Sequence, residues 1–171
     1  MTSVEELKKL KIDFPTEEKI IGYKSFYNRV VKRIIDFILA LIMTIVLSPL
    51  FIVVSVLIIS DDGFPVFYRA QRGGYKNKPF RIYKFRSMIN NADKIGGGTT
   101  ALNDSRITKI CSFLRKTKLD EFANLFNILR GEMSFIGPRP ELLQYTDQYE
   151  GVERYIFEVR PGITDYSSDV F

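Results

Sequence analysis

The longest apolar run of the chain, FILALIMTIVLSPLFIVVSVLII, occupies residues 37–59 and contains no charged residue. As one straight helix it would extend about 34 Å at about 1.5 Å per residue, which is enough to cross a hydrocarbon core of about 30 Å. A buried core helix is the alternative, but so long a run in a chain of 171 residues favours membrane insertion. A cleavable signal peptide fits poorly, because the run begins late and no small-residue cleavage site follows it.

A Ser48-Pro49 pair interrupts the run near its midpoint. Pro49 cannot donate a hydrogen bond to the carbonyl of Ile45, and the Ser48 hydroxyl is expected to bond back to the carbonyl of Thr44, which also bends helices. A bend there would give two arms, each about half a bilayer long. Kinked spanning helices are common, so the proline alone does not decide between a span and a re-entrant helix.

The flanks of the run favour re-entry. Basic residues lie on both sides, namely Lys24, Arg29, Lys32 and Arg33 before it and Arg69, Arg72, Lys76 and Lys78 after it. A span would place one basic flank outside, against the positive-inside tendency, whereas a helix that enters, bends and returns keeps both at an anionic cytoplasmic surface. We therefore predict a re-entrant membrane helix over residues 24–60, with Asp36 pairing with Lys32 and Arg33 at the interface.

Outside this run the patterning predicts an α+β fold dominated by helices. Residues 1–23 are predicted to form an N-terminal extension, and residues 61–171 are predicted to form one domain that is a single unit with the membrane helix. After a turn at Asp61-Asp62-Gly63, the stretches PVFYRAQ and FRIYKFRSM are predicted to pair as a short β-hairpin. A Gly-rich loop over 90–103 comes next, and such loops often cover substrates.

Helices are predicted for most of the remainder. Asp104 or Ser105 is expected to cap a helix that runs to about Arg115. A second helix is expected from Leu119 to Leu129, ending at Gly131, with one amphipathic stripe for the core or the membrane surface. Residues 141–158 are also expected to be helical. The stretches SFIGPRPELL and VRPGIT are predicted to be stiff turns, because prolines fix the backbone beside their arginines.

The amino-acid composition limits which partners, catalytic groups and metals are possible. The formal net charge of +5 and the sequence pI near 9.3 suit nucleic acid, anionic lipid or a phosphorylated substrate. The chain has no histidine, which excludes Ser-His and Cys-His catalysis and His-based zinc sites. The single Cys111 excludes an intramolecular disulfide and is expected to pack as a small apolar residue. Any metal is expected to be a hard ion bound by oxygen, such as magnesium.

Two adjacent carboxylates, Asp120 and Glu121, lie at the predicted start of the second helix in KTKLDEFANLF. Thr117 and Asp120 fit the capping box Ser/Thr-x-x-acid, which would make Asp120 structural. The alternative is a reactive pair, because a helix N-terminus attracts phosphate. A carboxylate about 4 Å from one negative charge is opposed by roughly 4 kcal/mol at an effective dielectric of 20. A magnesium ion and fixed arginines would offset that repulsion, so one acid could attack while the other holds the metal.

Four blocks of the chain resemble the bacterial monotopic phosphoglycosyl transferases, also called bacterial sugar transferases. The blocks are KRIIDFILALIMTIVLSPLF, FRIYKFRSM, LRKTKLDEFANLFNILRGEMSFIGPRP and VRPGIT, and they cover about Lys32 to Thr164. The resemblance implies transfer of a sugar 1-phosphate from a UDP-sugar to undecaprenyl phosphate, with release of UMP, by a covalent route that uses Mg²⁺. It implies that Asp120 is the nucleophile, that Glu121 with Asp120 holds magnesium, and that the re-entrant helix breaks at Ser48 and Pro49.

The resemblance also implies further site residues and a location. The substrate-binding residues would be Lys84, Arg86, Arg115, Arg139 and Arg160. The protein would lie in the bacterial inner membrane among its lipids, with the catalytic domain on the cytoplasmic face, and a homo-oligomer is possible. After Thr164 the chain departs from the family pattern, because Asp165 and YSSDVF follow where family members commonly extend further, which suggests a variant branch or a shortened chain.

A different class of function competes with catalysis. A non-catalytic membrane-tethered module could use the same basic surface to bind anionic lipid or nucleic acid. The arginines lie in separated stiff turns rather than in a stripe with base-stacking aromatic residues, which argues against a nucleic acid partner.

Overall fold

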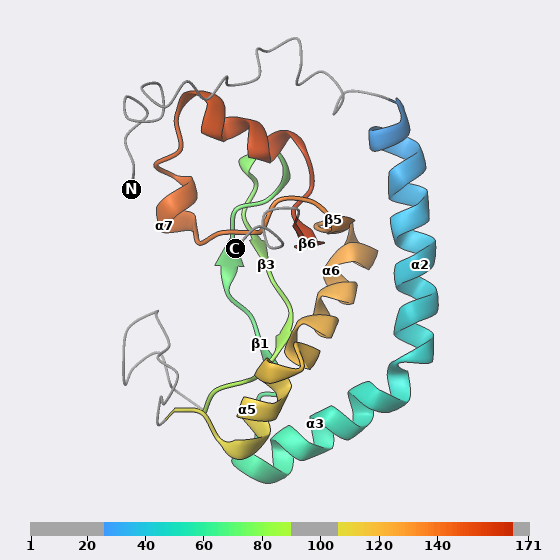
Figure 1. Ribbon diagram of the computed structural model, residues 1–171, viewed down its shortest axis with the longest axis vertical. Coiled ribbons are helices and arrows are strands. Elements are labelled where there is room, and N and C mark those ends of the chain that lie inside the picture. The colour runs from blue at the N-terminus through green and yellow to red at the C-terminus, as the bar shows by residue number, and fades with distance from the viewer. Residues whose placement is uncertain (1–25, 90–105, 166–171) are drawn as a thin grey trace.

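The computed structural model describes residues 26–89 and 106–165 (Figure 1). Helices dominate and the strands are only two or three residues long. In chain order the elements are the π-helix η2 (Tyr27–Val31), α2 (Lys32–Val46), α3 (Ser48–Asp62), β1 (Phe67–Tyr68), β2 (Gln71–Arg72), the 3₁₀ turn η3 (Tyr75–Asn77), β3 (Phe80–Arg81), β4 (Lys84–Phe85), α5 (Lys109–Lys116), the 3₁₀ helix η4 (Leu119–Asn124), α6 (Leu125–Arg130), β5 (Ser134–Ile136), α7 (Leu143–Thr146), the 3₁₀ helix η5 (Gly151–Glu158) and β6 (Gly162–Thr164). The predicted helix-dominated α+β class is confirmed.

The apolar run forms α2 and α3, which meet at Leu47 with a bend of 61°. Pro49 lies in the first turn of α3, where its missing N–H breaks no hydrogen bond. The Ser48 hydroxyl donates to the carbonyl of Ile45 at 2.8 Å, not to that of Thr44 as predicted. Among the described residues no single helix is long and apolar enough to cross a membrane, whereas the bent pair Tyr27–Val46 and Ser48–Asp62 together meets the length and composition required.

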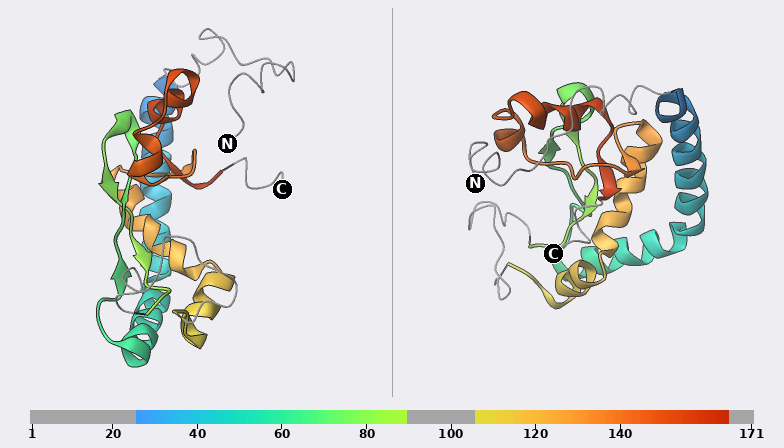
Figure 2. Two further views of the ribbon diagram at one scale, coloured as in Figure 1. Left: turned by 90° about the vertical axis from the view of Figure 1, so that its left-hand side faces the viewer. Right: turned by 45° about the horizontal axis from the view of Figure 1, so that its top comes forward.

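Both helices expose large apolar side chains. The inner face of α2 packs along α6, and α3 runs beneath the hairpin toward α5 (Figures 1 and 2). Only a few positions, such as Ala40, Val54 and Ile58, are buried against the rest of the molecule. The exposed positions include Ile34, Ile35, Phe37, Ile38, Leu39, Leu41, Ile42, Ile45, Val46, Ile52, Val53, Val56 and Leu57. A continuous apolar surface of this kind is typical of a membrane or protein contact.

A polar network ties the start of α2 to β5. Lys32 Nζ lies 3.0 Å from Asp36 Oδ2, and Ser134 Oγ donates to the same oxygen at 2.7 Å and also contacts Lys32 Nζ. The predicted pairing of Asp36 with Lys32 is therefore confirmed. Arg33 instead donates hydrogen bonds to the carbonyls of Ile128 and Leu129 in the last turn of α6, where the Ile128 carbonyl also accepts from Gly131 N.

The predicted hairpin is confirmed, but each of its strands is interrupted. β1 pairs with β4 and β2 pairs with β3, both antiparallel, and the breaks fall at residues 69–70 and 82–83. Ile82 N donates across the break to Ala70 O at 3.0 Å. The hairpin therefore remains continuous over both short ladders.

The side chain of Asn127 on α6 bonds the hairpin at this interruption. Its Oδ1 accepts from Tyr83 N at 2.8 Å, and its Nδ2 donates to Arg81 O at 2.9 Å and to Glu132 Oε2 at 2.7 Å. Asn127 is fully buried. A buried amide whose donor and acceptor groups are paired replaces part of the missing strand ladder and docks the hairpin on α6.

Several predicted boundaries differ from the structure. α3 continues through Asp62, so the acids predicted to form a turn lie in its last turn before Gly63. α5 is capped by Thr108, whose side chain accepts from Cys111 N, whereas Asp104 and Ser105 lie outside the described residues. The expected second helix exists and ends at Gly131, but its first half is 3₁₀.

The final third of the chain also differs in detail. Residues 141–158 form α7 and η5 rather than one helix. The two stretches predicted to be stiff turns are partly strands. The first three residues of SFIGPRPELL form β5 and the last three of VRPGIT form β6, and these strands pair in parallel with Ser134 opposite Gly162. Close approach explains the glycines here, since a Cβ on Gly137 would lie 2.3 Å from Arg160 O and one on Gly162 would lie 2.2 Å from Gly137 N. The extension over 1–23 and the loop over 90–103 lie outside the described residues.

Replacing Asn127 by leucine is expected to destabilise the protein by about 2–4 kcal/mol, because Tyr83 N–H and Arg81 C=O would be buried without partners. The measurement is thermal unfolding by circular dichroism, where the loss should lower Tm by several degrees. Gln71→Leu, which changes an exposed amide on β2, is the matched control and should unfold close to wild type. Equal Tm values for Asn127→Leu and wild type would contradict the docking role.

Candidate active site

Asp120 lies at the start of η4, immediately after a sharp change of backbone direction. Lys118 adopts a left-handed conformation with φ of 54°, which ends α5 and starts the 3₁₀ helix. The predicted capping box is wrong, because Thr117 Oγ1 donates back to the carbonyl of Phe113 at 2.8 Å. No side chain caps η4. The Asp120 carboxylate is therefore not held in a cap with Thr117.

The Asp120 side chain is buried, with only 8% of the residue exposed. Ser87 Oγ, at the end of the hairpin, donates to its Oδ2 at a long 3.4 Å. Burial raises the pKa of Asp120, the positive charge of Lys84 lowers it, and the negative charge of Glu121 raises it. Burial dominates, so this carboxylate is less stable as an anion than an ordinary aspartate, which makes it more reactive toward an electrophile when it is ionised.

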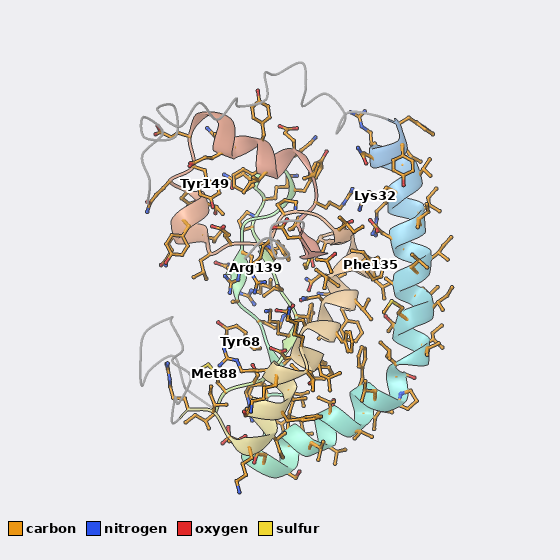
Figure 3. The ribbon with its side chains drawn as sticks, in the orientation of Figure 1. Lys32, Tyr68, Met88, Phe135, Arg139 and Tyr149 are labelled. Carbon is orange, nitrogen blue, oxygen red and sulfur yellow. The ribbon has the colours of Figure 1, made fainter. Side chains whose placement is uncertain are left out.

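Glu121 contacts two cationic side chains that come from separate segments of the chain. Lys84 Nζ, on β4, lies 2.7 Å from Glu121 Oε1, and Arg139 Nη2, in the turn after β5, lies 3.7 Å from the same oxygen. Arg139 lies near the middle of the molecule in Figure 3, where its side chain is 70% exposed. Neither contact uses Oε2 of Glu121. The structure thus brings together Glu121, Lys84 and Arg139, which are far apart in sequence.

These side chains line a cavity of about 90 Å³. Its polar wall consists of Arg72, Lys84, Glu121, Asn124 and Arg139, and its apolar wall includes Ile82, Met133 and Ile163. Three cationic side chains against one lining carboxylate make the cavity electropositive, and Asp120 precedes Glu121 directly. A concave, cationic site beside a buried carboxylate is suited to a phosphorylated substrate.

Residues 27–168 match the family described as bacterial sugar transferase, which is more than half of the chain. The protein belongs to the bacterial sugar transferase family. The resemblance noted in the sequence is thereby confirmed.

Three relatives illustrate the range of this bacterial sugar transferase family. The chain is 39% identical over 142 residues to the UDP-glucose:undecaprenyl-phosphate glucose-1-phosphate transferase of Klebsiella pneumoniae, covering 80% of this chain and 30% of the relative. It is 38% identical over 143 residues to the UDP-N-acetylgalactosamine-undecaprenyl-phosphate N-acetylgalactosaminephosphotransferase of Aeromonas hydrophila, covering 82% and 34%. It is 41% identical over 137 residues to a Bacillus subtilis (strain 168) protein that is named "Putative undecaprenyl-phosphate N-acetylgalactosaminyl 1-phosphate transferase". That match covers 80% of this chain and 74% of the relative. The chain therefore spans about a third of the length of the first two relatives.

Three of the predicted substrate-binding arginines do not line this cavity. Arg86 is buried and pairs with Asp62 at 3.2 Å while donating to the carbonyls of Asp62 and Gly63, which holds the end of α3. Arg115 lies in the last turn of α5. Arg160 lines a second cavity of about 540 Å³, where its Nε donates to Gly131 O at 2.8 Å.

Sequence reasoning missed three polar residues of the site. Ser87 contacts Asp120, and Arg72 and Asn124 line the cavity. Arg72 stands in a basic flank that we interpreted as membrane-facing, and Asn124 stands in a helix whose polar positions resemble a solvated face. A signal for Asn124 existed, since it lies three residues after Glu121 and so on the same side of one helical turn.

The residues present fit a magnesium ion. No cluster of three or more His, Cys, Asp or Glu suited to a metal occurs within 26–89 and 106–165. Mg²⁺, however, is usually held by one or two carboxylates together with substrate phosphates. Asp120 and Glu121 are adjacent carboxylates of this kind. Asn124 Oδ1, which is buried without a hydrogen-bond partner among the described residues, is an oxygen in the same cavity wall as Glu121.

Asp120→Asn is expected to unfold at a higher temperature than wild type at neutral pH. The folded-state pKa of Asp120 is raised by burial, so its protonated form stabilises the fold at low pH and that contribution is lost as pH rises through the raised pKa. Asparagine does not ionise, so the Tm difference should widen from about pH 4 to about pH 8. Thermal unfolding of both proteins across that range tests this, and a difference that narrows with rising pH would contradict it.

Proposed function

We propose that this protein transfers a sugar 1-phosphate from a UDP-sugar to undecaprenyl phosphate and releases UMP, with Asp120 as the nucleophile. Family membership and the names of the relatives support the reaction class. The observation that carries the assignment is a buried carboxylate of raised pKa beside a cation-lined cavity. Relatives of similar identity are named for glucose and for N-acetylgalactosamine, so the sugar is left to experiment.

The proposed reaction has two displacements at one phosphorus atom. An Asp120 carboxylate oxygen attacks the phosphorus that bears the sugar, the bond from that phosphorus to uridylate breaks, and UMP leaves with the electron pair. A phosphate oxygen of undecaprenyl phosphate then attacks the same phosphorus and breaks its bond to Asp120. The carboxylate is regenerated and undecaprenyl diphosphate-sugar is the product.

The cations of the cavity address the repulsion between nucleophile and substrate. Lys84 attracts both Asp120 and Glu121, and Arg139 reaches the same carboxylate of Glu121 from a turn stiffened by Pro138 and Pro140. Preorganised charges of this kind stabilise charge that develops in the transition state. When bound, Mg²⁺ would neutralise the diphosphate of the donor, and Glu121, Asp120 and Asn124 are the residues we propose to hold it.

We further propose that α2 and α3 form a re-entrant membrane element on the cytoplasmic face of the inner membrane. Each helix has 15 residues, which is about 22 Å at about 1.5 Å per residue, so neither arm alone crosses about 30 Å of hydrocarbon. Their exposed apolar side chains and the 61° bend support insertion and return. Basic residues at both ends, such as Arg29 and Lys78, suit an anionic surface.

Asp120→Asn is expected to lower turnover by more than about 1,000-fold, because the covalent nucleophile is removed. The assay follows UMP release from a panel of UDP-sugars with undecaprenyl phosphate and Mg²⁺ in detergent. The exposed Asp147→Asn is the matched control and should retain wild-type turnover. Retained turnover in Asp120→Asn would support a different nucleophile, and no turnover by wild type with any donor would support a non-catalytic module.

Cysteines introduced at Arg29 and Lys78, in a background where the buried Cys111 is replaced by alanine, are expected to react from the same side of the membrane. Labelling of intact cells with an impermeant maleimide, before and after lysis, makes the comparison. Both positions should be protected until lysis, because both flanks remain cytoplasmic. Reaction of only one of them in intact cells would replace re-entry by a span.

A further inference from the structure

Arg72 lies inside the cavity, although its sequence context gives it no role there. Its backbone is fixed on two sides, because β2 pairs Arg72 with Phe80 of β3 and a separate bridge joins Arg72 to Leu142. The adjacent Gly73 N also donates to Glu141 O at 3.0 Å. The strand position is therefore well determined, and the side chain lines the same cavity as Glu121 and Lys84.

The protein supplies few hydrogen bonds and little negative charge to the guanidinium of Arg72. Its Nε is buried and has no hydrogen-bond partner among the described residues. Burial lowers the pKa of Arg72, Tyr68 raises it in part, and the positive charge of Arg139 lowers it again. The net lowering indicates that this cation would gain from an added anion. Glu141 attracts Arg72, but its Oε2 already accepts a 2.5 Å hydrogen bond from the Tyr149 hydroxyl.

The other two cations of the cavity are already paired. Lys84 and Arg139 both lie within ion-pair distance of Glu121 Oε1. Arg139 is largely exposed, so its pair with Glu121 is weak. Even with Asp120 ionised as well as Glu121, the three cations leave an excess of one positive charge. Arg72 is the cavity cation whose charge is partly buried and not used by an ion pair among residues 26–89 and 106–165.

We propose that Arg72 is a substrate-binding residue that donates hydrogen bonds to the diphosphate of the nucleotide-sugar donor. The inference rests on the proposed function and adds to it a residue that contacts the donor. A guanidinium presents a planar set of N–H donors that matches phosphate oxygens, and a bound phosphate would pair the buried Nε. The donor diphosphate would thus lie between Arg72 on β2 and the carboxylates of η4.

Direct binding of UDP and of uridine, measured by isothermal titration calorimetry without turnover, tests this assignment. Arg72→Met keeps the apolar stem and removes the guanidinium, and we expect it to weaken UDP binding by about 10- to 100-fold. Uridine lacks phosphates, so its affinity should be unchanged. The UDP affinity of Arg72→Lys should fall between those of wild type and Arg72→Met, because lysine keeps the charge but loses the planar donor pair. Arg81→Met, on the neighbouring strand with an exposed side chain, is the matched control and should bind UDP as wild type does.

The stability of the unliganded protein separates binding from a structural role. Removing a partly buried cation that makes no ion pair should leave the Tm of Arg72→Met equal to or above that of wild type, while the Tm increase caused by UDP is lost. Wild-type UDP affinity in Arg72→Met would overturn the proposal, as would an equal loss of affinity for UDP and uridine. If no UDP-sugar is turned over but UDP binding still depends on Arg72, the diphosphate contact stands and the proposed reaction fails.

Discussion

The buried amide of Asn127 is the contact on which the arrangement of the site depends. It bonds Tyr83 N and Arg81 O at the point where the hairpin ladder is interrupted, and so fixes the hairpin against α6. Lys84 follows Tyr83 directly, and its Nζ reaches Glu121 at 2.7 Å. A hairpin of two-residue ladders would be too weak to hold a lysine in place by itself. With the amide paired on both sides, Lys84 is positioned by a helix rather than by its own strands.

The sequence was sufficient for features that depend on local chemistry and insufficient for those that depend on tertiary contact. The bend at Ser48-Pro49, the hairpin and the end of α6 at Gly131 follow from proline, alternation and glycine, and all are present. The capping box failed because the Thr117 hydroxyl bonds within α5 instead. Asn127 could not be assigned, since a polar residue in an amphipathic helix gives no sign that a hairpin will cover it.

The arginines show the same limit. Prolines beside Arg139 and Arg160 indicate that both are held, but not in which direction they point. The parallel pairing of β5 with β6 and the close approach of Gly137 to Gly162 hold the two turns side by side. Arg139 then lines the cavity with Glu121, whereas Arg160 lines the larger cavity beside α2 and bonds the end of α6. The direction in which each arginine side chain points is set by the fold, so it could not be derived from the spacing of residues in the sequence.

The three-residue strand β5 joins the apolar helices to the site. At its start, Ser134 bonds Asp36 on α2, and after its end the chain turns into the segment that carries Arg139. In the proposed membrane placement, the depth of α2 in the bilayer and the height of the cavity above the surface are therefore fixed relative to each other. This matters for the proposed chemistry, because a polyprenyl phosphate is held by its tail in the lipid and cannot move freely along the membrane normal. In this proposal, the carboxylates of η4 are placed by α6, which continues η4 and packs on α2. The bond between Ser134 and Asp36 couples the Arg139 segment to the same helix.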